Sequence, residues 1–297
     1  MKLIDLHCDT AYRIWSEHTS FSSTKLQIRK DTVEKFEDLI QIFAFWSNYK
    51  MTNEEAWSNF LSCYNHFNSL HFPQSMKRLY AIEDLRLIGT ELSKIALLKN
   101  MGISFAGLFW AEDNLFGSGH NCVLDMGLSD FGKEVVLKCF EHKVVVDVSH
   151  ASSKSTEQIL KLAADYHQPI FASHSNFHAV THHTRNLQTE HAQEIERLGG
   201  IIGLSFVPSH LGDEKIEGFI RHLEYGLSLN LDDCLCIGSD FDGTDCLPIG
   251  ISSQSDIFYL HKVLTDRGLP SNKCENLLWG NGNLFLKKHK IGLHISN

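Results

Sequence analysis

Two short apolar runs that each end in a histidine constrain the fold of this chain more than any other feature. Residues 144–150 read VVVDVSH and residues 169–174 read PIFASH, and a stretch rich in Lys, Glu, Leu and Ala separates them. A strand, a helix and a second strand in this order predict a parallel α/β sheet. In a barrel of this type the C-terminal strand ends carry the chemistry, so the two histidines indicate a metal site at one mouth.

The length and charge of the chain narrow the classes of fold and partner. The chain has 297 residues, of which 43% are hydrophobic and 21% charged, and this composition is sufficient for one large core. We expect a single (β/α)8 TIM barrel domain over residues 1–297. The net charge of -9 argues against nucleic acid or an anionic membrane surface as partner, because both require a basic face.

The cysteines and the N-terminus indicate where such a protein would work. The eight cysteines include no C-x-x-C pair, and a disulfide framework is expected in small secreted chains rather than in one of this length. The first residues already read as a strand, which predicts that no signal peptide is present. No apolar run reaches membrane-spanning length. We therefore expect a cytoplasmic protein with reduced thiols that does not bind membranes.

Hydrophobic periodicity along the chain predicts eight strands alternating with helices. The predicted strands are residues 3–6, 40–46, 78–82, 103–110, 144–150, 169–174, 201–206 and 234–238. The predicted helices are residues 53–70, 91–100, 129–142, 155–166, 189–198, 213–229, 255–266 and 271–288. In the fifth strand, alternation predicts that the valines at 144, 146 and 148 share with His150 a face turned toward the mouth. Residues 11–32 and 175–187 are expected as long mouth loops, the first acting as a lid.

Polar residues at the ends of five predicted strands form a candidate metal site. They are His7, Asp9, Glu83, His150, His174 and Asp240. Imidazole nitrogen with carboxylate oxygen suits zinc, with manganese, iron or cobalt as substitutes. Six such groups exceed one tetrahedral ion, so two ions bridged by Glu83 and a hydroxide are the economical arrangement. A hydroxide shared by two metals is a strong nucleophile near neutral pH, and Asp240 is suited to accept and return the water's proton. The reaction class predicted is hydrolysis of a carbonyl or phosphoryl bond.

Several of these residues have a simpler interpretation. The H-x-D pair of residues 7–9 also fits a solvated strand end, and Asp84 fits a helix N-terminal acid stabilised by the dipole. Arg185 in a mouth loop suits bidentate recognition of a substrate carboxylate, although surface arginines are common. The neighbouring histidines of that loop fit loop residues better than metal ligands (His178, His182 and His183).

An ordered set of motifs resembles the membrane dipeptidase (renal dipeptidase) family of the metal-dependent amidohydrolase superfamily. The motifs occur at residues 7–9 (HCD), 83 (E), 146–150 (VDVSH), 171–175 (FASHS), 184–187 (TRNL), 199–203 (GGIIG), 238–243 (GSDFDG) and 282–284 (GNL). Each motif alone is weak, but the order is specific and the resemblance covers nearly the whole chain.

The resemblance implies a binuclear zinc dipeptidase on a (β/α)8 barrel. By position, His7, Asp9 and a bridging Glu83 would hold one Zn2+, and Glu83, His150 and His174 would hold the other. The family accepts dipeptides and tolerates a D-residue at the C-terminal position. The implied partner is therefore a small dipeptide substrate. Relatives often form dimers, so a homodimer is a state to test, although the sequence identifies no interface.

The same resemblance places Arg185 at the family's substrate-carboxylate arginine and Asp240 at its catalytic aspartate. The chain departs from the mammalian pattern at Trp110, which stands where those enzymes carry a substrate-binding histidine. Tryptophan cannot accept a proton, so oxyanion stabilisation would come largely from the metal, with a loop histidine as substitute (His120, His178 or His182). The departure keeps open an alternative function, a barrel metallohydrolase acting on another amide, lactone or phosphoester. A non-catalytic binding barrel is the third hypothesis, which the intact ligand set disfavours.

Overall fold

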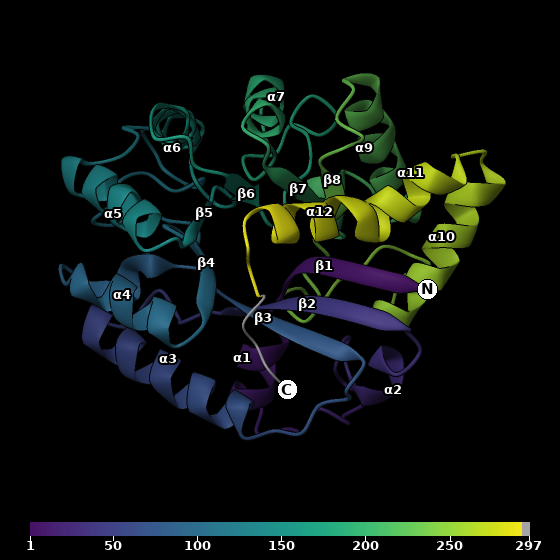
Figure 1. The fold of residues 1–297 in the computed structure, drawn as a ribbon, viewed down its shortest axis with the longest axis horizontal. Coiled ribbons are helices and arrows are strands. Elements are labelled where there is room, and N and C mark those ends of the chain that lie inside the picture. Colours follow the sequence, from purple (N-terminus) through teal and green to yellow (C-terminus); the bar gives the residue numbers. More distant parts are fainter. Residues whose placement is uncertain (293–297) are drawn as a thin grey trace.

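The structure, a computed structural model, describes residues 1–292 and is built on a closed barrel of parallel strands in the order β1 to β8 (Figure 1). This arrangement confirms the predicted (β/α)8 fold. The strands are β1 (Lys2–Cys8), β2 (Asp38–Phe45), β3 (Met76–Ile82), β4 (Ile103–Gly107), β5 (Val145–Asp147), β6 (Ile170–Ala172), β7 (Ile201–Leu204) and β8 (Leu235–Ile237).

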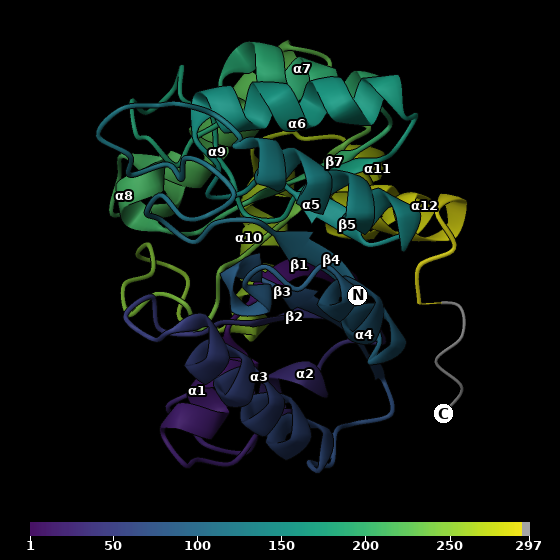
Figure 2. The ribbon, with the colours of Figure 1, turned by 90° about the vertical axis from the view of Figure 1, so that its left-hand side faces the viewer.

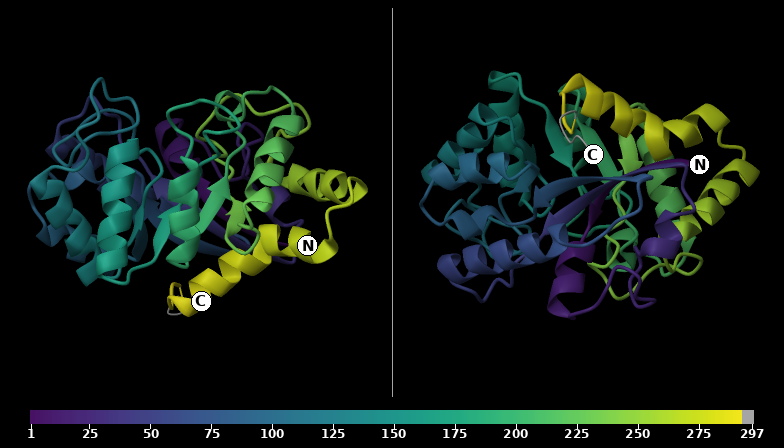
Figure 3. Two further views of the ribbon diagram at one scale, coloured as in Figure 1. Left: turned by 90° about the horizontal axis from the view of Figure 1, so that it is seen from above. Right: turned by 60° about the horizontal axis from the view of Figure 1, so that its bottom comes forward.

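Helices surround this barrel and follow the strands in sequence (Figure 3). They are α1 (Thr10–Ser16), α2 (Lys30–Val33), α3 (Asn53–Asn68), α4 (Ser93–Asn100), α5 (Asp130–Glu141), α6 (Ser153–Asp165), α7 (Thr189–Arg197), α8 (Pro208–Leu211), α9 (Ile216–Ser228), α10 (Ile257–Asp266), α11 (Ser271–Glu275) and α12 (Asn281–Lys288). A π-helical turn over Asn276–Gly280 joins α11 to α12, and short 3-10 turns cover Leu85–Ile88 and Gln254–Asp256. Within residues 1–292, no helix combines the length and apolar character needed to cross a membrane.

Two apolar layers hold the barrel together, because successive strand residues point to opposite faces. The interior layer includes Ile4, Leu6, Phe105 and Phe171, and the rings of Phe105 and Phe171 stack with centroids 4.5 Å apart. Phe285 of α12 joins this interior layer. Figure 2 shows α12 at one end of the barrel and α8 with the loops after the strands at the other. One end is therefore filled by apolar side chains, and the opposite end is left for the site.

Val144, Val146 and Val148 share one face as expected, but the prediction that this face turns toward the mouth and includes His150 is wrong. Val145 points into the barrel interior, whereas Val146 belongs to the layer between strands and helices. The strand stops at Asp147, whose Oδ1 accepts hydrogen bonds from the backbone N–H groups of Ser149 (2.9 Å) and Ser173 (3.0 Å). These bonds turn the chain out of the sheet, and His150 lies three residues beyond the strand with φ of 71°. His150 thus reaches the mouth from a turn and not from a strand face.

The first strand contains an irregularity that the sequence pattern does not reveal. Asp5 pairs with Gln41 and Cys8 with Phe43, so three steps along β1 match two along β2. The extra residue forms a bulge, which rotates the following side chains relative to the sheet. His7 lies inside this bulge, directly before the loop that carries Asp9. Residues 11–32, predicted as an open loop, begin instead within α1 and include α2.

Candidate metal and hydrolytic site

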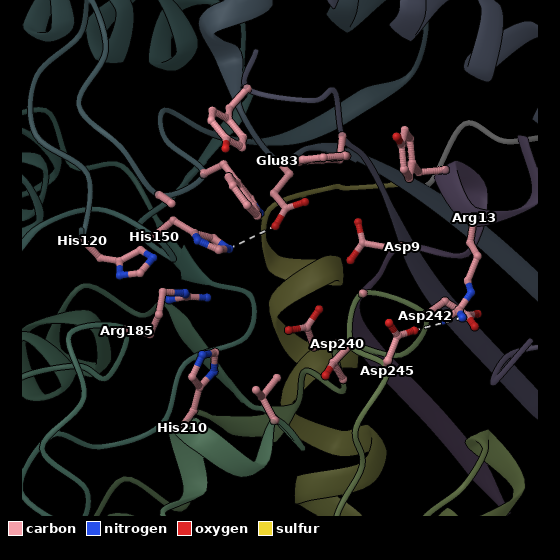
Figure 4. A pocket seen from close by; sticks show the side chains of 18 of the residues that line it. Asp9, Arg13, Glu83, His120, His150, Arg185, His210, Asp240, Asp242 and Asp245 are labelled. Atoms are coloured by element: carbon pink, nitrogen blue, oxygen red, sulfur yellow. Dashed lines mark hydrogen bonds and ion pairs between the residues drawn. The ribbon is translucent and has the colours of Figure 1, made fainter. Parts of the chain in front are cut away.

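The six strand-end residues predicted from the sequence meet at one mouth of the barrel. Their ligand atoms form three overlapping groups in which all members lie within 4.8 Å of one another: His7, Asp9 and Glu83; Glu83, His150 and His174; and His7, His174 and Asp240. Four of the six line a cavity of about 700 Å³, namely Asp9, Glu83, His150 and Asp240 (Figure 4). The sequence therefore identified the side chains that converge here, although their roles stay predictions.

Glu83 stands at the centre of this cluster. Its Oε1 lies 3.0 Å from His150 Nε2 and 3.9 Å from both His7 Nε2 and His174 Nε2. Donor atoms around a tetrahedral ion with bonds of about 2.0–2.2 Å are roughly 3.3–3.6 Å apart. The separation of 3.3 Å between His7 Nε2 and Asp9 Oδ2 matches this spacing. Glu83, His7 and His174 are each shared by two of the groups, and Glu83 is the only carboxylate of the three, so it is the one suited to bridge two ions.

The charges of the buried groups also fit divalent cations. Burial, and then the neighbouring Asp9 carboxylate, hold the pKa of Glu83 well above its ordinary value, and burial raises the pKa of Asp240 to about 6. Burial alone would lower the pKa of His7. The carboxylates of Asp9, Glu83 and Asp240 outweigh this effect of burial and raise the pKa of His7 to about 10. Carboxylates crowded out of water in this way need positive charge to stay ionised. A pair of cations held by nitrogen and oxygen donors would supply that charge.

His150 and His174 are prepared as neutral ligands. Burial, followed by repulsion from Arg185 or His7, places the pKa of both imidazoles well below the ordinary value. Their Nε2 atoms face each other at 2.9 Å, and Ser173 Oγ lies 2.7 Å from Nδ1 of His174. Neutral imidazole is the form that binds metal, and a partner on the other ring nitrogen fixes its orientation. Ser173 thus orients His174, whereas Nδ1 of His150 is buried without a hydrogen-bond partner within residues 1–292.

Backbone strain is concentrated around the same cluster. His150, Asp240 and Asp242 have φ values of 71°, 62° and 64°, a region that residues other than glycine seldom adopt. The backbone N–H of Asp240 donates to His7 O (3.2 Å), which ties the loop after β8 to β1. At Gly243, an added Cβ would lie 2.3 Å from both Asp240 Oδ1 and Asp9 Oδ2. These loops accept strained conformations in order to bring the carboxylates together.

Arg185 extends into the cavity from the loop after β6 (Figure 4). The guanidinium is buried and donates through Nη2 to His174 O (3.1 Å), while the Arg185 backbone N–H donates to His183 Nδ1 (3.1 Å). Its Nε has no hydrogen-bond partner within residues 1–292. Burial lowers its pKa to about 10, so the group stays charged near neutral pH. The anchored cation with a free donor is suited to bind a carboxylate, and this role stays a prediction.

Trp110 also lines the cavity, with its ring centroid 6.4 Å from that of His150. Of the three histidines considered as substitutes at this position, His120 lies on the cavity wall, where its Nδ1 is 3.0 Å from Thr184 Oγ1. The other two, His178 and His182, stack on each other at 4.7 Å and are not among the residues that line this cavity.

Some wall residues were missed by sequence reasoning. Asp242 accepts from Thr10 Oγ1 (2.6 Å) and from the backbone N–H groups of Gln27 (2.7 Å) and Ile28 (3.2 Å), so it ties the loop after β8 to the segment before α2. The D-x-D spacing with Asp240 was a signal for it. His210 lies in α8, a helix the periodicity did not predict, and three aromatic side chains also line the wall (Tyr12, Trp46 and Tyr49).

Comparison with known families and sequences gives a consistent result. The family model of membrane dipeptidase, peptidase family M19, matches residues 49–288. An uncharacterized protein in the pqqA 5' region of Klebsiella pneumoniae is 29% identical over 199 residues, covering 63% of this chain and 72% of that protein. Dipeptidase tcpJ of Claviceps purpurea is 27% identical over 67% of this chain and 48% of its own length. Dipeptidase aclJ of Aspergillus oryzae is 26% identical over 73% of this chain and 52% of its own length. The chain thus spans about half the length of these fungal relatives.

Solved structures show the same fold. A crystal structure described as the dipeptidase AC, a metallo peptidase of family M19, superposes with a TM-score of 0.87 at 22% identity, covering 97% of this chain and 98% of that one. A metallo peptidase from Rhodobacter sphaeroides, liganded with a phosphinate mimic of the dipeptide L-Ala-D-Ala, gives a TM-score of 0.83 at 20% identity, covering 97% and 99%.

Proposed function

This chain belongs to the membrane dipeptidase family, peptidase family M19, and from that premise we propose that it is a metal-dependent dipeptidase. The observation that carries the proposal is the sharing of Glu83 between two groups of ligand atoms, with Arg185 on the same cavity. Two metal positions next to a buried guanidinium suit a short substrate that ends in a carboxylate. The fungal dipeptidases among its relatives support this substrate class.

We assign the metal-holding residues from the donor groups. His7, Asp9 and Glu83 would hold one ion, and Glu83, His150 and His174 the other. Zinc suits these nitrogen and oxygen donors, and Mn2+, Co2+ or Fe2+ can replace it. When bound, the ions polarise a carbonyl oxygen and lower the pKa of a water molecule.

The other residues of the cavity bind the substrate and move protons. Arg185 would take the terminal carboxylate through its guanidinium and so orient the peptide bond above Glu83. The carboxylate of Asp240 would accept the proton of the attacking water and deliver it to the leaving amine nitrogen. A dipeptide is thereby bound at its carboxylate end while its peptide bond lies at the centre of the cluster.

We also propose tolerance for a D-residue at the C-terminal position. The superposed Rhodobacter sphaeroides enzyme is liganded with a phosphinate mimic of L-Ala-D-Ala. Arg185 lines the cavity here and would contact the substrate at its carboxylate, a group common to both stereoisomers. The preference for one isomer then depends on the walls beside Arg185.

Elemental analysis and a substrate panel test the proposal together. We expect two transition-metal ions per chain and release of free amino acids from L-Ala-D-Ala and L-Ala-L-Ala, lost on chelation and restored by Zn2+. Turnover of a lactone or phosphoester without any dipeptide turnover would overturn the proposal in favour of another barrel hydrolase. Metal-free protein that cleaves dipeptides at the same rate would overturn the metal assignment.

A further inference from the structure

One wall of the cavity consists of four aromatic side chains that no step of the proposed reaction uses. Tyr12 lies on α1, Trp46 and Tyr49 follow β2, and Trp110 follows β4. Their rings are in sequence: Tyr12 meets Trp46 edge-on at 4.8 Å, Trp46 meets Trp110 at 5.3 Å, and Trp110 stacks on Tyr49 at 5.7 Å with 15° between the planes. We call these four residues the aromatic wall.

The aromatic wall lies along the metal-ligand cluster. Trp110, the ring next to Tyr49 in this order, has its centroid 6.4 Å from that of His150. At the other end Tyr12 comes three residues after Asp9, on the helix that follows β1. The wall therefore extends beside both proposed metal groups and not beside one alone.

Arg185 stands across the mouth from this wall. The wall residues follow β1, β2 and β4, whereas Arg185 follows β6, which is opposite β2 in a closed barrel of eight strands. A dipeptide whose carboxylate lies on Arg185 and whose peptide bond lies over Glu83 directs its amino-terminal residue away from β6. The side chain of that residue then meets the aromatic wall.

Two features of the aromatic wall point to a ligand. Tyr49 exposes 48% of its surface although its ring stacks on Trp110. The Trp46 indole Nε1 is shielded from solvent and has no acceptor within residues 1–292. A buried indole N–H normally finds a partner, and apolar rings lining a cavity are typical of ligand subsites. The exposed ring of Tyr49 favours contact with a planar group, and the indole N–H of Trp46 is a donor for a polar atom of the same ligand.

We propose that the aromatic wall is a specificity subsite for an aromatic side chain at the amino-terminal residue of a dipeptide. The inference rests on the proposed dipeptidase function and adds the substrate class. Offset-stacked and edge-on ring pairs are more favourable than contact area alone predicts, so an aromatic ring should bind better than a saturated ring of the same size.

The experiment compares three dipeptides that share a C-terminal D-alanine: L-Phe-D-Ala, L-cyclohexylalanyl-D-Ala and L-Ala-D-Ala. We expect kcat/KM for the phenylalanyl substrate to exceed that for the cyclohexylalanyl substrate by about 5-fold. Tyr49→Leu should reduce this advantage to within about 2-fold, because it removes the outer stacked ring. Tyr166→Leu, another exposed tyrosine that does not line the cavity, is the matched control and should retain the full advantage.

Binding without turnover provides the second measurement. Calorimetry with phosphinate mimics of L-Phe-D-Ala and L-Ala-D-Ala should show tighter binding of the first, and Tyr49→Leu should remove the difference. Trp46→Phe, which keeps a ring but removes the indole N–H, should weaken both mimics less than Trp46→Leu. Melting curves by circular dichroism confirm that each variant is folded.

The possible failures are distinguishable. Hydrolysis of L-Ala-D-Ala with equal kcat/KM for the phenylalanyl and cyclohexylalanyl substrates would overturn the subsite and leave the dipeptidase intact. An unchanged advantage in Tyr49→Leu would also overturn it. Failure to hydrolyse any of the three dipeptides, together with no binding of either phosphinate, would overturn both the subsite and the proposed function.

Discussion

The two halves of the barrel mouth differ in chemistry. The half above β1 to β4 carries the aromatic wall, and the half above β5 to β8 carries Arg185, His183 and His210. His120 belongs to the loop after β4 but reaches this second half, where its Nδ1 lies 3.0 Å from Thr184 Oγ1. Burial, followed by the charge of Arg185, lowers the pKa of His120 to about 3 and that of His210 to about 2. These imidazoles are therefore neutral near pH 7, and Arg185 supplies the positive charge of this half. One half is suited to bind by charge and the other by shape, with the metal-ligand cluster between them.

The largest effect should come from a substitution in the metal-ligand cluster, which lies between the two halves. Asp240→Asn keeps the size of the side chain but removes the proton acceptor, so kcat should fall by about 10²- to 10⁴-fold for every dipeptide. Elemental analysis of the same sample should show retained metal. Asp233→Asn, an exposed position just before β8, is the control and should be fully active. Undiminished turnover in Asp240→Asn would remove Asp240 from the reaction.

The half of the mouth that carries Arg185 should show the next largest effect. Arg185→Met removes a buried charge-assisted contact worth about 1.5–3 kcal/mol, so kcat/KM for dipeptides should fall roughly 10- to 150-fold. Dipeptide amides lack the terminal carboxylate, and their smaller rates should fall much less. Arg197→Met, on the exposed surface of α7, serves as the control. Equal losses for dipeptides and their amides would show that Arg185 acts on something other than the carboxylate.

A third variant tests how strictly the positions of the Asp9 and Asp240 carboxylates determine metal affinity. In Gly243→Ala the new Cβ would lie 2.3 Å from Asp9 Oδ2 and Asp240 Oδ1, so both carboxylates must move. We expect metal affinity to weaken by about 10- to 100-fold, as for other displaced ligand-orienting groups. Competition with a chelating dye measures the affinity, and Thr244→Ser is the adjacent control. The ratio of rates for aromatic and aliphatic dipeptides should stay constant, because neither half is changed. Unaltered affinity would mean that the loop yields without disturbing the carboxylates.

The sequence predicted the metal-ligand cluster better than the two halves of the mouth that flank it. Glu83 and His174 come directly after apolar strands, and parallel strands place such residues at one mouth, so their convergence could be inferred without coordinates. The position of His150 was predicted but not its backbone, because its left-handed turn depends on hydrogen bonds to Asp147 from two separate segments. The bulge at His7 likewise depends on pairing with β2, which hydrophobic alternation does not encode.

Of the aromatic wall, only Trp110 was placed at the mouth from the sequence, through the resemblance, and the other three residues lay outside the reach of the same reasoning. Trp46 reads as the last residue of an apolar strand, and Tyr12 reads as part of an open loop, so neither pattern indicates a shared surface. Their rings meet only because α1 packs beside the end of β2. Spacing in sequence locates groups on one element, but contacts between loops of different strands depend on tertiary structure.

The smallest predicted effect separates stability from selectivity. Ser152 is the N-cap of α6, beside the half of the mouth that carries Arg185. Its Oγ accepts a hydrogen bond from the Ser155 N–H (3.1 Å) and donates one to Asp125 Oδ1 (2.6 Å). Ser152→Ala should cost about 1 kcal/mol of unfolding free energy, and Ser153→Ala, at an exposed neighbouring position, should cost much less. Thermal unfolding should show a drop in Tm of about 2 °C. The preference for aromatic dipeptides should be unchanged, because α6 packs against α5 and α7 in the outer helix layer. A shifted preference would mean that the packing of α6 reaches across the mouth, and the two halves would then act as one unit.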